Sequence, residues 1–181
     1  MQTKILGFTG TQKEMTEQQK LTVKMLFEKE GKGTILHHGD CVGADAEAHQ
    51  IAAPLGYRIV KHPCDIDSKR ANCWCYEGVW TAKAPIERNH DIVDCCHLLI
   101  ATPKGFDEEQ RSGTWATIRY AVRVRKEVIV VWPDGRYETI VTLPLHVNRE
   151  VKSKTEPYFS LKGATTGRYS STSSVKEQDK F

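Results

Sequence analysis

Three short runs of small and hydroxyl-bearing residues are the parts of this chain best suited to hold an anion. The run Ser112-Gly113-Thr114 follows a polar loop and opens a segment whose apolar residues recur at helical spacing. Ser112 is the expected N-cap, and Gly113 lets another group approach the backbone closely. Because the first N–H groups of a helix lack partners and carry the positive end of its dipole, this helix start is suited to a phosphate. The alternative is that the run only caps the helix.

The other two runs are Thr9-Gly10-Thr11 and the segment from His38 to Asp45. We expect Gly10 and Thr11 to line the wall opposite the phosphate. In the second segment, small residues would let a ligand or neighbouring backbone approach closely, and two aspartates would accept ribose hydroxyls or hold the turn. N-capping of the following helix is the favoured role for Asp45. The small residues are Gly39, Gly43 and Ala44, and the aspartates are Asp40 and Asp45.

Basic and aromatic side chains complete the candidate set. Arg88 has a fork of donors that can clamp a phosphate or carboxylate, with a surface salt bridge as the alternative, and Arg111 is a second candidate clamp. Trp115 is expected either to stack on a base or to pack in the core. His37 and His38 end an apolar run, and we expect one of them to be packed inside the fold.

Alternating apolar strands and helices must position these residues. Apolar runs predict five strands, at 4–8, 34–37, 57–60, 98–101 and 127–132, with helices between them. This alternation indicates right-handed crossovers. We therefore expect an α/β, Rossmann-like three-layer sandwich with a five-stranded parallel sheet of order 3-2-1-4-5, and a possible extra edge strand at 138–145. The irregular stretch 61–84 is either functional or an excursion whose aromatic residues pack on the body.

The expected strand order brings the three runs to one crevice. The order reverses between the first and fourth strands, and ligands of such sheets bind beyond the carboxyl ends of the strands at the reversal. All three runs follow strands at that end, and the first and third flank the reversal. Their convergence is therefore a stronger prediction of a ligand site than any single run.

Charge and composition limit the class of function. The chain has 181 residues, 39% of them hydrophobic, and a net charge of +3, as expected of a globular protein. Residues 147–181 are rich in Ser, Thr and Lys and hold seven basic and four acidic residues, so we expect a flexible tail behind a domain at 1–146. The remaining body is neutral, which argues against a nucleic-acid partner, because phosphate neutralisation needs clustered Lys and Arg.

The apolar runs and cysteines point to a cytoplasmic protein. No apolar run approaches the length of a membrane span, and the first residues lack a secretion signal. The six cysteines are therefore expected to be reduced thiols. Cys73-x-Cys75 and Cys95-Cys96 do not have the spacing of a zinc site. We accordingly expect neither a metal nor a cofactor.

Three of these motifs resemble the SLOG superfamily, which contains the LOG phosphoribohydrolases, the YspA-like proteins and the Rossmann-like part of DprA. They are the turn Gly39–Asp45, the pair Arg88-Asn89 and the run Ser112-Gly113-Thr114. The likeness spans residues 4–132 and is closest to the small YspA-like members. It implies a nucleotide or nucleotide-derived, ADP-ribose-like ligand and a homodimer or higher homo-oligomer.

The sequence departs from the LOG enzymes where they perform catalysis. Their motif P-G-G-x-G-T-x-x-E supplies a Glu that, with an upstream Arg, serves cleavage of the bond between base and ribose phosphate. Arg88 matches that Arg, but Thr117 stands in the place of the Glu, and the loop 103–112 replaces the P-G-G. A threonine cannot stabilise an oxocarbenium-like state as a carboxylate does. The departure favours a sensor or sequestering protein over an enzyme.

The alternative function is a LOG-like hydrolase that cleaves the N-glycosidic bond of a nucleoside monophosphate or related nucleotide. Its catalytic residues would be Arg88 with Glu108 or Glu109, supplied by the loop. A DprA-like single-strand DNA binder is disfavoured by the neutral body. The candidate ligand-binding residues are Gly10, Thr11, Gly39, Asp40, Gly43, Ala44, Asp45, Arg88, Asn89, Arg111, Ser112, Gly113, Thr114 and Trp115.

Overall fold

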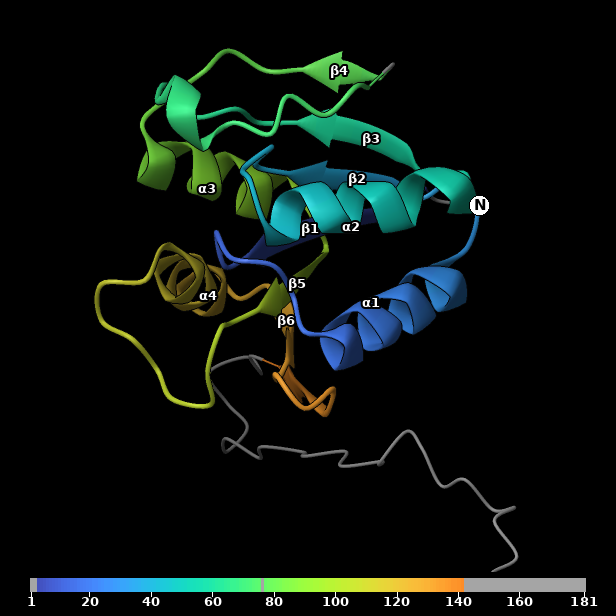
Figure 1. Ribbon diagram of the computed structural model, residues 1–181, viewed down its shortest axis with the longest axis vertical. Coiled ribbons are helices and arrows are strands. Elements are labelled where there is room, and N and C mark those ends of the chain that lie inside the picture. Colours follow the sequence, from blue (N-terminus) through green and yellow to red (C-terminus); the bar gives the residue numbers. More distant parts are fainter. Residues whose placement is uncertain (1–2, 76, 142–181) are drawn as a thin grey trace, which may run out of the picture.

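A computed structural model describes residues 3–75 and 77–141, which form a sheet with helices on both faces (Figure 1). The domain boundary expected at 146 and the tail expected at 147–181 lie outside these residues. The strands are β1 (Ile5–Gly10), β2 (Ile35–His38), β3 (Arg58–Lys61), β4 (Gly78–Val79), β5 (Leu98–Thr102), β6 (Glu127–Val131) and β7 (Tyr137–Ile140). The helices are α1 (Glu17–Glu30), α2 (Ala44–Ala52), α3 (Pro85–Cys95) and α4 (Gly113–Arg123), with short 3₁₀ turns at Ala53–Leu55 and Asp67–Lys69.

The sheet has the order β4-β3-β2-β1-β5-β6-β7, and every pairing is parallel except that of β7 with β6. The expected count of five strands was wrong, and the full order differs accordingly. The five strands read from apolar runs lie in the middle, and β7 is an added edge strand beginning near residue 138. At the other edge, β4 pairs with β3 through Gly78 and Val79. It was missed because two residues inside an irregular stretch carry no periodic signal.

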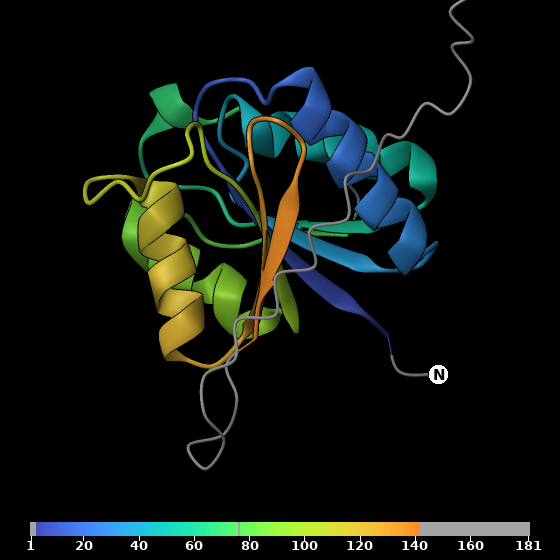
Figure 2. The ribbon, with the colours of Figure 1, turned by 90° about the horizontal axis from the view of Figure 1, so that it is seen from below.

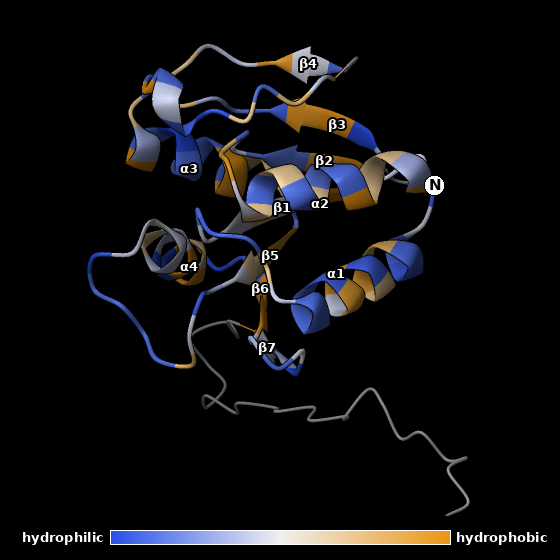
Figure 3. Ribbon diagram, viewed as in Figure 1, coloured by the Kyte–Doolittle hydropathy of each residue, from blue (hydrophilic) through white to orange (hydrophobic). Residues whose placement is uncertain are grey.

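Two helices cover each face of the sheet, which gives the expected three layers. Figure 2 shows α1 and α2 on one side and α3 and α4 on the other. Figure 3 shows apolar residues concentrated in β3 and β6 and alternating with polar ones along α1. Each large apolar side chain buried between layers contributes roughly 1.5–3 kcal/mol. The core under α1 and α2 includes Phe8, Phe27, Leu36 and Ile100, and the core under α3 and α4 includes Val93, Leu99, Ile118 and Val128.

Capping residues fix where the helices begin. The hydroxyl of Thr16 accepts the N–H of Gln19 at 3.1 Å, and the Gln19 side chain accepts the N–H of Thr16, so α1 begins with a capping box. Ser112 accepts a first-turn N–H of α4 at 3.3 Å, which confirms the expected N-cap. The capping role expected of Asp45 was wrong, because Gly43 is the N-cap of α2 and Asp45 lies inside the helix.

The irregular stretch 61–84 folds back on the body rather than extending from it. Its Trp80 ring lies 4.4 Å from the ring of His62, centroid to centroid, and the amide of Trp80 donates to the carbonyl of Lys61 at 2.9 Å. Trp80 remains 42% exposed. Within the part of the chain that the structure describes, no helix has the length and apolar character needed to cross a membrane.

Candidate functional site

The turns that follow β1 and β5 are hydrogen-bonded to each other and to the start of α2. The N–H of Thr11 donates to the carbonyl of Thr102 at 3.2 Å, and the N–H of Ala44 donates to the carbonyl of Thr11 at 3.0 Å. A Cβ at Gly10 would lie 2.4 Å from both Ala44 Cβ and Thr102 Oγ1, so the turns pack this closely only with glycine there. The runs expected to converge therefore do so at the carboxyl ends of the central strands.

A cavity of about 440 Å³ opens beside these turns, at the first turns of α3 and α4. Its volume is within the range of small-molecule sites, which is roughly 300–1,000 Å³. No histidine lines it in the described part of the chain. Most of the predicted ligand-binding residues lie in its wall: Gly10, Thr11, Asp45, Arg88, Asn89, Arg111, Ser112, Gly113, Thr114 and Trp115.

The start of α4 presents backbone to the cavity. Gly113 and Thr114 are the first two residues of the helix, so their N–H groups have no partner within it. A Cβ built on Gly113 meets nothing within 4 Å, which leaves open space directly against the backbone. The helix dipole places partial positive charge at the same point. These features can together hold a phosphate oxygen.

Arg88 is buried in the cavity wall and is not the surface salt bridge that was weighed as its alternative. Only 5% of the residue is exposed. Its Nη2 lies 3.0 Å from the sulfur of Cys41, its Nη1 lies 3.7 Å from the carboxylate of Asp45, and its buried Nε has no hydrogen-bond partner in the described residues. A buried guanidinium with one loose ion pair and an orphan donor retains capacity for an anionic ligand.

Asp45 holds the turn before α2 and balances Arg88. Its carboxylate accepts the N–H of Cys41 at 3.2 Å. Burial raises the pKa of Asp45 to about 6, against the opposing effect of the Arg88 charge. Burial and the Asp45 charge raise the pKa of the Cys41 thiol to about 11, so this thiol stays protonated near neutral pH and is a poor nucleophile.

The cavity wall carries more positive than negative charge. Asp45 faces Arg88, and Glu109 pairs with Lys104 at 3.1 Å. Two further cations, Lys69 and Arg111, line the cavity and form no ion pair with a described residue. This excess is local, because the body of the chain is neutral. It favours an anionic ligand.

Some predicted residues serve the turns and lie outside the cavity wall. Asp40 accepts from Lys61 Nζ at 3.1 Å and from the N–H of Cys73 at 2.9 Å, so it holds the segment rather than facing a ligand. A Cβ at Gly43, whose φ is +88°, would meet backbone at 2.4 Å. Gly39 and Ala44 likewise pack against Arg88 and Gly10. Their close approach is to neighbouring protein, the alternative that the sequence left open.

The residues at the LOG catalytic positions form structural contacts. Thr117 Oγ1 accepts the Asn89 amide at 2.7 Å and donates to the carbonyl of Gly113 at 2.8 Å, which ties α3 to α4. Glu108 pairs with Arg119 at 2.8 Å and does not line the cavity, whereas Glu109 does. Trp115 packs in the core under α4, which is one of the two expectations for it, and it also borders the cavity. Its stacking on a base stays a prediction.

Several cavity residues were not expected from the sequence. The cations Lys69 and Lys104 lie in segments without periodic pattern. Cys41 lies inside the recognised turn Gly39–Asp45, and Gln12, Pro85 and Ile86 lie near recognised motifs. Pro85 at the first position of α3 signals a helix start, and this signal could have placed a second helix N-terminus at the site. The position of Lys69 depends on the long stretch 61–84 and has no such signal.

Comparison with known proteins shows the fold but no family. No family model matches the sequence, and no curated protein matches it. A structure of the molybdenum cofactor binding protein from the phototrophic bacterium Rippkaea orientalis is 20% identical, with a TM-score of 0.57 over 73% of this chain and 78% of that chain. A structural-genomics target, TM1055, is 16% identical, with a TM-score of 0.53 over 69% and 72%. These likenesses support a Rossmann-like α/β fold, while the SLOG resemblance stays a prediction.

Proposed function

We propose that this protein binds a nucleotide or nucleotide-derived molecule of the ADP-ribose type in the cavity at the carboxyl ends of β1 and β5, as a sensor or sequestering protein. The observation that carries the proposal is that the open start of α4 and the buried Arg88 line the same cavity. Backbone N–H groups at Gly113 and Thr114 and the guanidinium of Arg88 then bind a phosphate together.

Other residues of the cavity would bind the rest of such a ligand. Lys69 and Arg111 have no carboxylate partner among the described residues and line the same cavity, so the second phosphate of a pyrophosphate gains a cationic contact there. Trp115, at the cavity border, offers a ring for a base or ribose. A cofactor-binding protein among the structures of similar fold agrees with a small-molecule ligand.

Binding is favoured over hydrolysis because the carboxylates at the cavity are engaged. Asp45 holds the N–H of Cys41 and faces Arg88, and Glu109 pairs with Lys104. Glu109 is the residue that keeps the alternative, an N-glycosidic hydrolase, in consideration, since it is the loop carboxylate that lines the cavity. A homo-oligomer remains part of the proposal and is tested by light scattering.

The two functions are separated by one incubation. Purified protein is mixed with AMP, ADP-ribose or NAD, binding is followed by calorimetry, and freed base is followed by chromatography. Binding without release of adenine or nicotinamide supports the proposal. Release that disappears in Glu109→Gln, with Glu108→Gln as the matched control outside the cavity, replaces it with the hydrolase. Failure of all three probes to bind contradicts both.

A further inference from the structure

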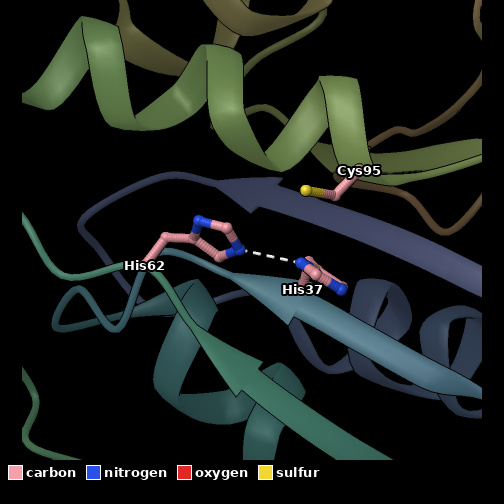
Figure 4. Close-up of side chains that lie close together, drawn as sticks. All are labelled: His37, His62 and Cys95. Carbon is pink, nitrogen blue, oxygen red and sulfur yellow. Dashed lines mark hydrogen bonds between the residues drawn. The ribbon is translucent and has the colours of Figure 1, made fainter. Parts of the chain in front are cut away.

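Two buried histidines and a cysteine lie together away from the cavity. His37 is on β2, His62 directly follows β3, and Cys95 is the last residue of α3. One candidate ligand atom from each lies within 4.8 Å of the other two. Figure 4 shows the Cys95 sulfur above the space between the two facing imidazole nitrogens, which are 2.7 Å apart. We propose that these three side chains bind a zinc ion, with one coordination position left open.

The donor set suits zinc. Imidazole nitrogen and thiolate sulfur are the ligands that Zn²⁺ prefers, and three protein ligands plus solvent is the arrangement of zinc sites with an open position. His37 is 7% exposed and His62 is fully buried, so the rings are already held by the fold. A small opening of the 2.7 Å contact between them admits the ion, since ligand nitrogens of a tetrahedral site lie farther apart than hydrogen-bonded ones.

Zinc binding releases one proton. The two imidazoles coordinate in their neutral form and the cysteine coordinates as a thiolate, so the Cys95 thiol loses its proton to solvent as the sulfur–zinc bond forms. The proton now shared between the rings moves to a ring nitrogen that faces away from the ion.

The residues around the cluster provide a negative charge near the ion and leave part of the cluster open to solvent. Asp91, one helical turn before Cys95, acts electrostatically on His62 and pairs with Lys83 at 2.8 Å. Its charge complements the net positive charge of a zinc–thiolate centre. The Trp80 indole lies against the His62 ring, whereas Cys95 is only partly buried, so the cluster reaches the surface at Cys95. The site would tie the end of α3 to β2 and β3, at the opposite end of the helix from Arg88.

These three residues cannot be recognised as a metal site from the sequence, because they lie far apart in it. A zinc signature depends on ligands a few residues apart, whereas His37, His62 and Cys95 come from three elements that meet only after the sheet forms. For the same reason, the Cys95-Cys96 pair taken alone does not predict a zinc site. In the fold, Cys96 donates to the carbonyl of Val93 and packs in the core, and only Cys95 faces the histidines.

The test is metal binding by the intact protein under a non-thiol reductant. Zinc content is measured by mass spectrometry after dialysis, affinity by competition with a chromophoric chelator, and ligand type by the absorption of the cobalt form. We expect one zinc per chain and a thiolate-to-cobalt charge-transfer band. Cys95→Ala should weaken zinc binding by more than about 100-fold, because loss of outer-sphere partners alone costs 10–100-fold.

Matched variants separate this cluster from other thiols. Cys75→Ala removes a partly buried thiol outside the cluster and should leave zinc affinity and the cobalt spectrum unchanged. His62→Gln tests the buried ring, and circular dichroism reports whether it folds; if it does not, His37→Gln takes its place. Equal zinc binding by Cys95→Ala, binding lost only with Cys75, or no binding above the buffer control overturns the proposal.

Discussion

The guanidinium of Arg88 lies in the space that a side chain on Gly39 would need: a Cβ built on Gly39 is 1.2 Å from Arg88 Nη1. The same Cβ would be 2.7 Å from the carboxylate of Asp45. The glycine of the turn after β2 and the arginine of α3 are therefore two parts of one arrangement. This packing explains why the G-D-C-V-G-A-D turn and the R-N pair occur together, although 49 positions separate Gly39 from Arg88.

Gly39→Ala is predicted to displace Arg88 from the cavity. The clash is with a side chain, so the guanidinium moves rather than the backbone, at a stability cost of about 1–3 kcal/mol. Affinity for ADP-ribose should fall at least severalfold in calorimetry, and urea unfolding should report the stability loss. Gly78→Ala is the control, because its Cβ meets nothing within 4 Å. An unchanged affinity with Gly39→Ala would mean that Arg88 does not contact the ligand.

Arg88→Met is predicted to weaken both binding and folding. Loss of a charged hydrogen bond to phosphate costs roughly 1.5–3 kcal/mol of binding, which is tenfold or more in dissociation constant. Asp45 is left as an unpaired buried carboxylate, which costs about 3–5 kcal/mol of stability. The double variant Arg88→Met/Asp45→Asn should regain much of that stability without regaining binding. Recovery of affinity in the double variant would show that Arg88 acts only through the fold.

Binding of ADP-ribose is predicted to strengthen as pH falls through about 6, the raised pKa of Asp45. Protonation neutralises the carboxylate beside Arg88 and so increases the positive charge that the ligand meets. ADP-ribose is the appropriate probe because its pyrophosphate does not titrate there, unlike a phosphate monoester with a second pKa of about 6. Calorimetry of Asp45→Asn should show a pH-independent affinity. A wild-type affinity that is equally independent of pH would show that protonation of Asp45 does not affect binding of the ligand.

The same shift predicts a pH dependence of stability. The folded pKa of Asp45, about 6, is above its ordinary value of 3.8, so the folded state binds more protons between these two pH values. The contribution of Asp45 to stability therefore increases as pH falls from about 6 towards 3.8. Urea titrations at several pH values give the free energy of unfolding of wild type and of Asp45→Asn. The contribution of Asp45 is the difference between the slopes of these free energies plotted against pH. Parallel plots for the two proteins would contradict the raised pKa.

Gln19→Leu is predicted to destabilise the fold and loosen the loop after β5. The buried Gln19 amide donates to the carbonyls of Pro103 and Val131, both at 2.9 Å, and so joins α1 to β6 and to the start of the loop. Leaving buried carbonyls unpaired costs about 1–3 kcal/mol. Hydrogen exchange should rise in 103–112. Gln18→Leu, on the same helix, is the control, and equal stability of the two variants would contradict this role.

Apolar runs and small-residue turns were enough to predict the central sheet and the convergence of its loops. These features are local, and the handedness of crossovers then fixes where the turns meet. The strand β4 and the cavity lysine Lys69 were not predictable, since both depend on how the irregular stretch 61–84 folds back. The sequence predicts a capping role for Asp45 because an Asp near a helix start usually caps that helix. In the fold, Asp45 lies inside α2, and its buried carboxylate faces Arg88 instead of capping the helix.

Calorimetry of ADP-ribose with two matched glycine variants tests most directly whether the start of α4 binds the ligand. A Cβ at either Gly113 or Gly105 meets nothing within 4 Å, but Gly113 borders the cavity and Gly105 does not. Valine at either position should therefore leave the melting temperature nearly unchanged. If the start of α4 binds the phosphate, wild type and Gly105→Val bind ADP-ribose equally and Gly113→Val loses at least tenfold in affinity, about 1.4 kcal/mol. Equal affinity of all three proteins, or no binding by wild type, would contradict this binding mode.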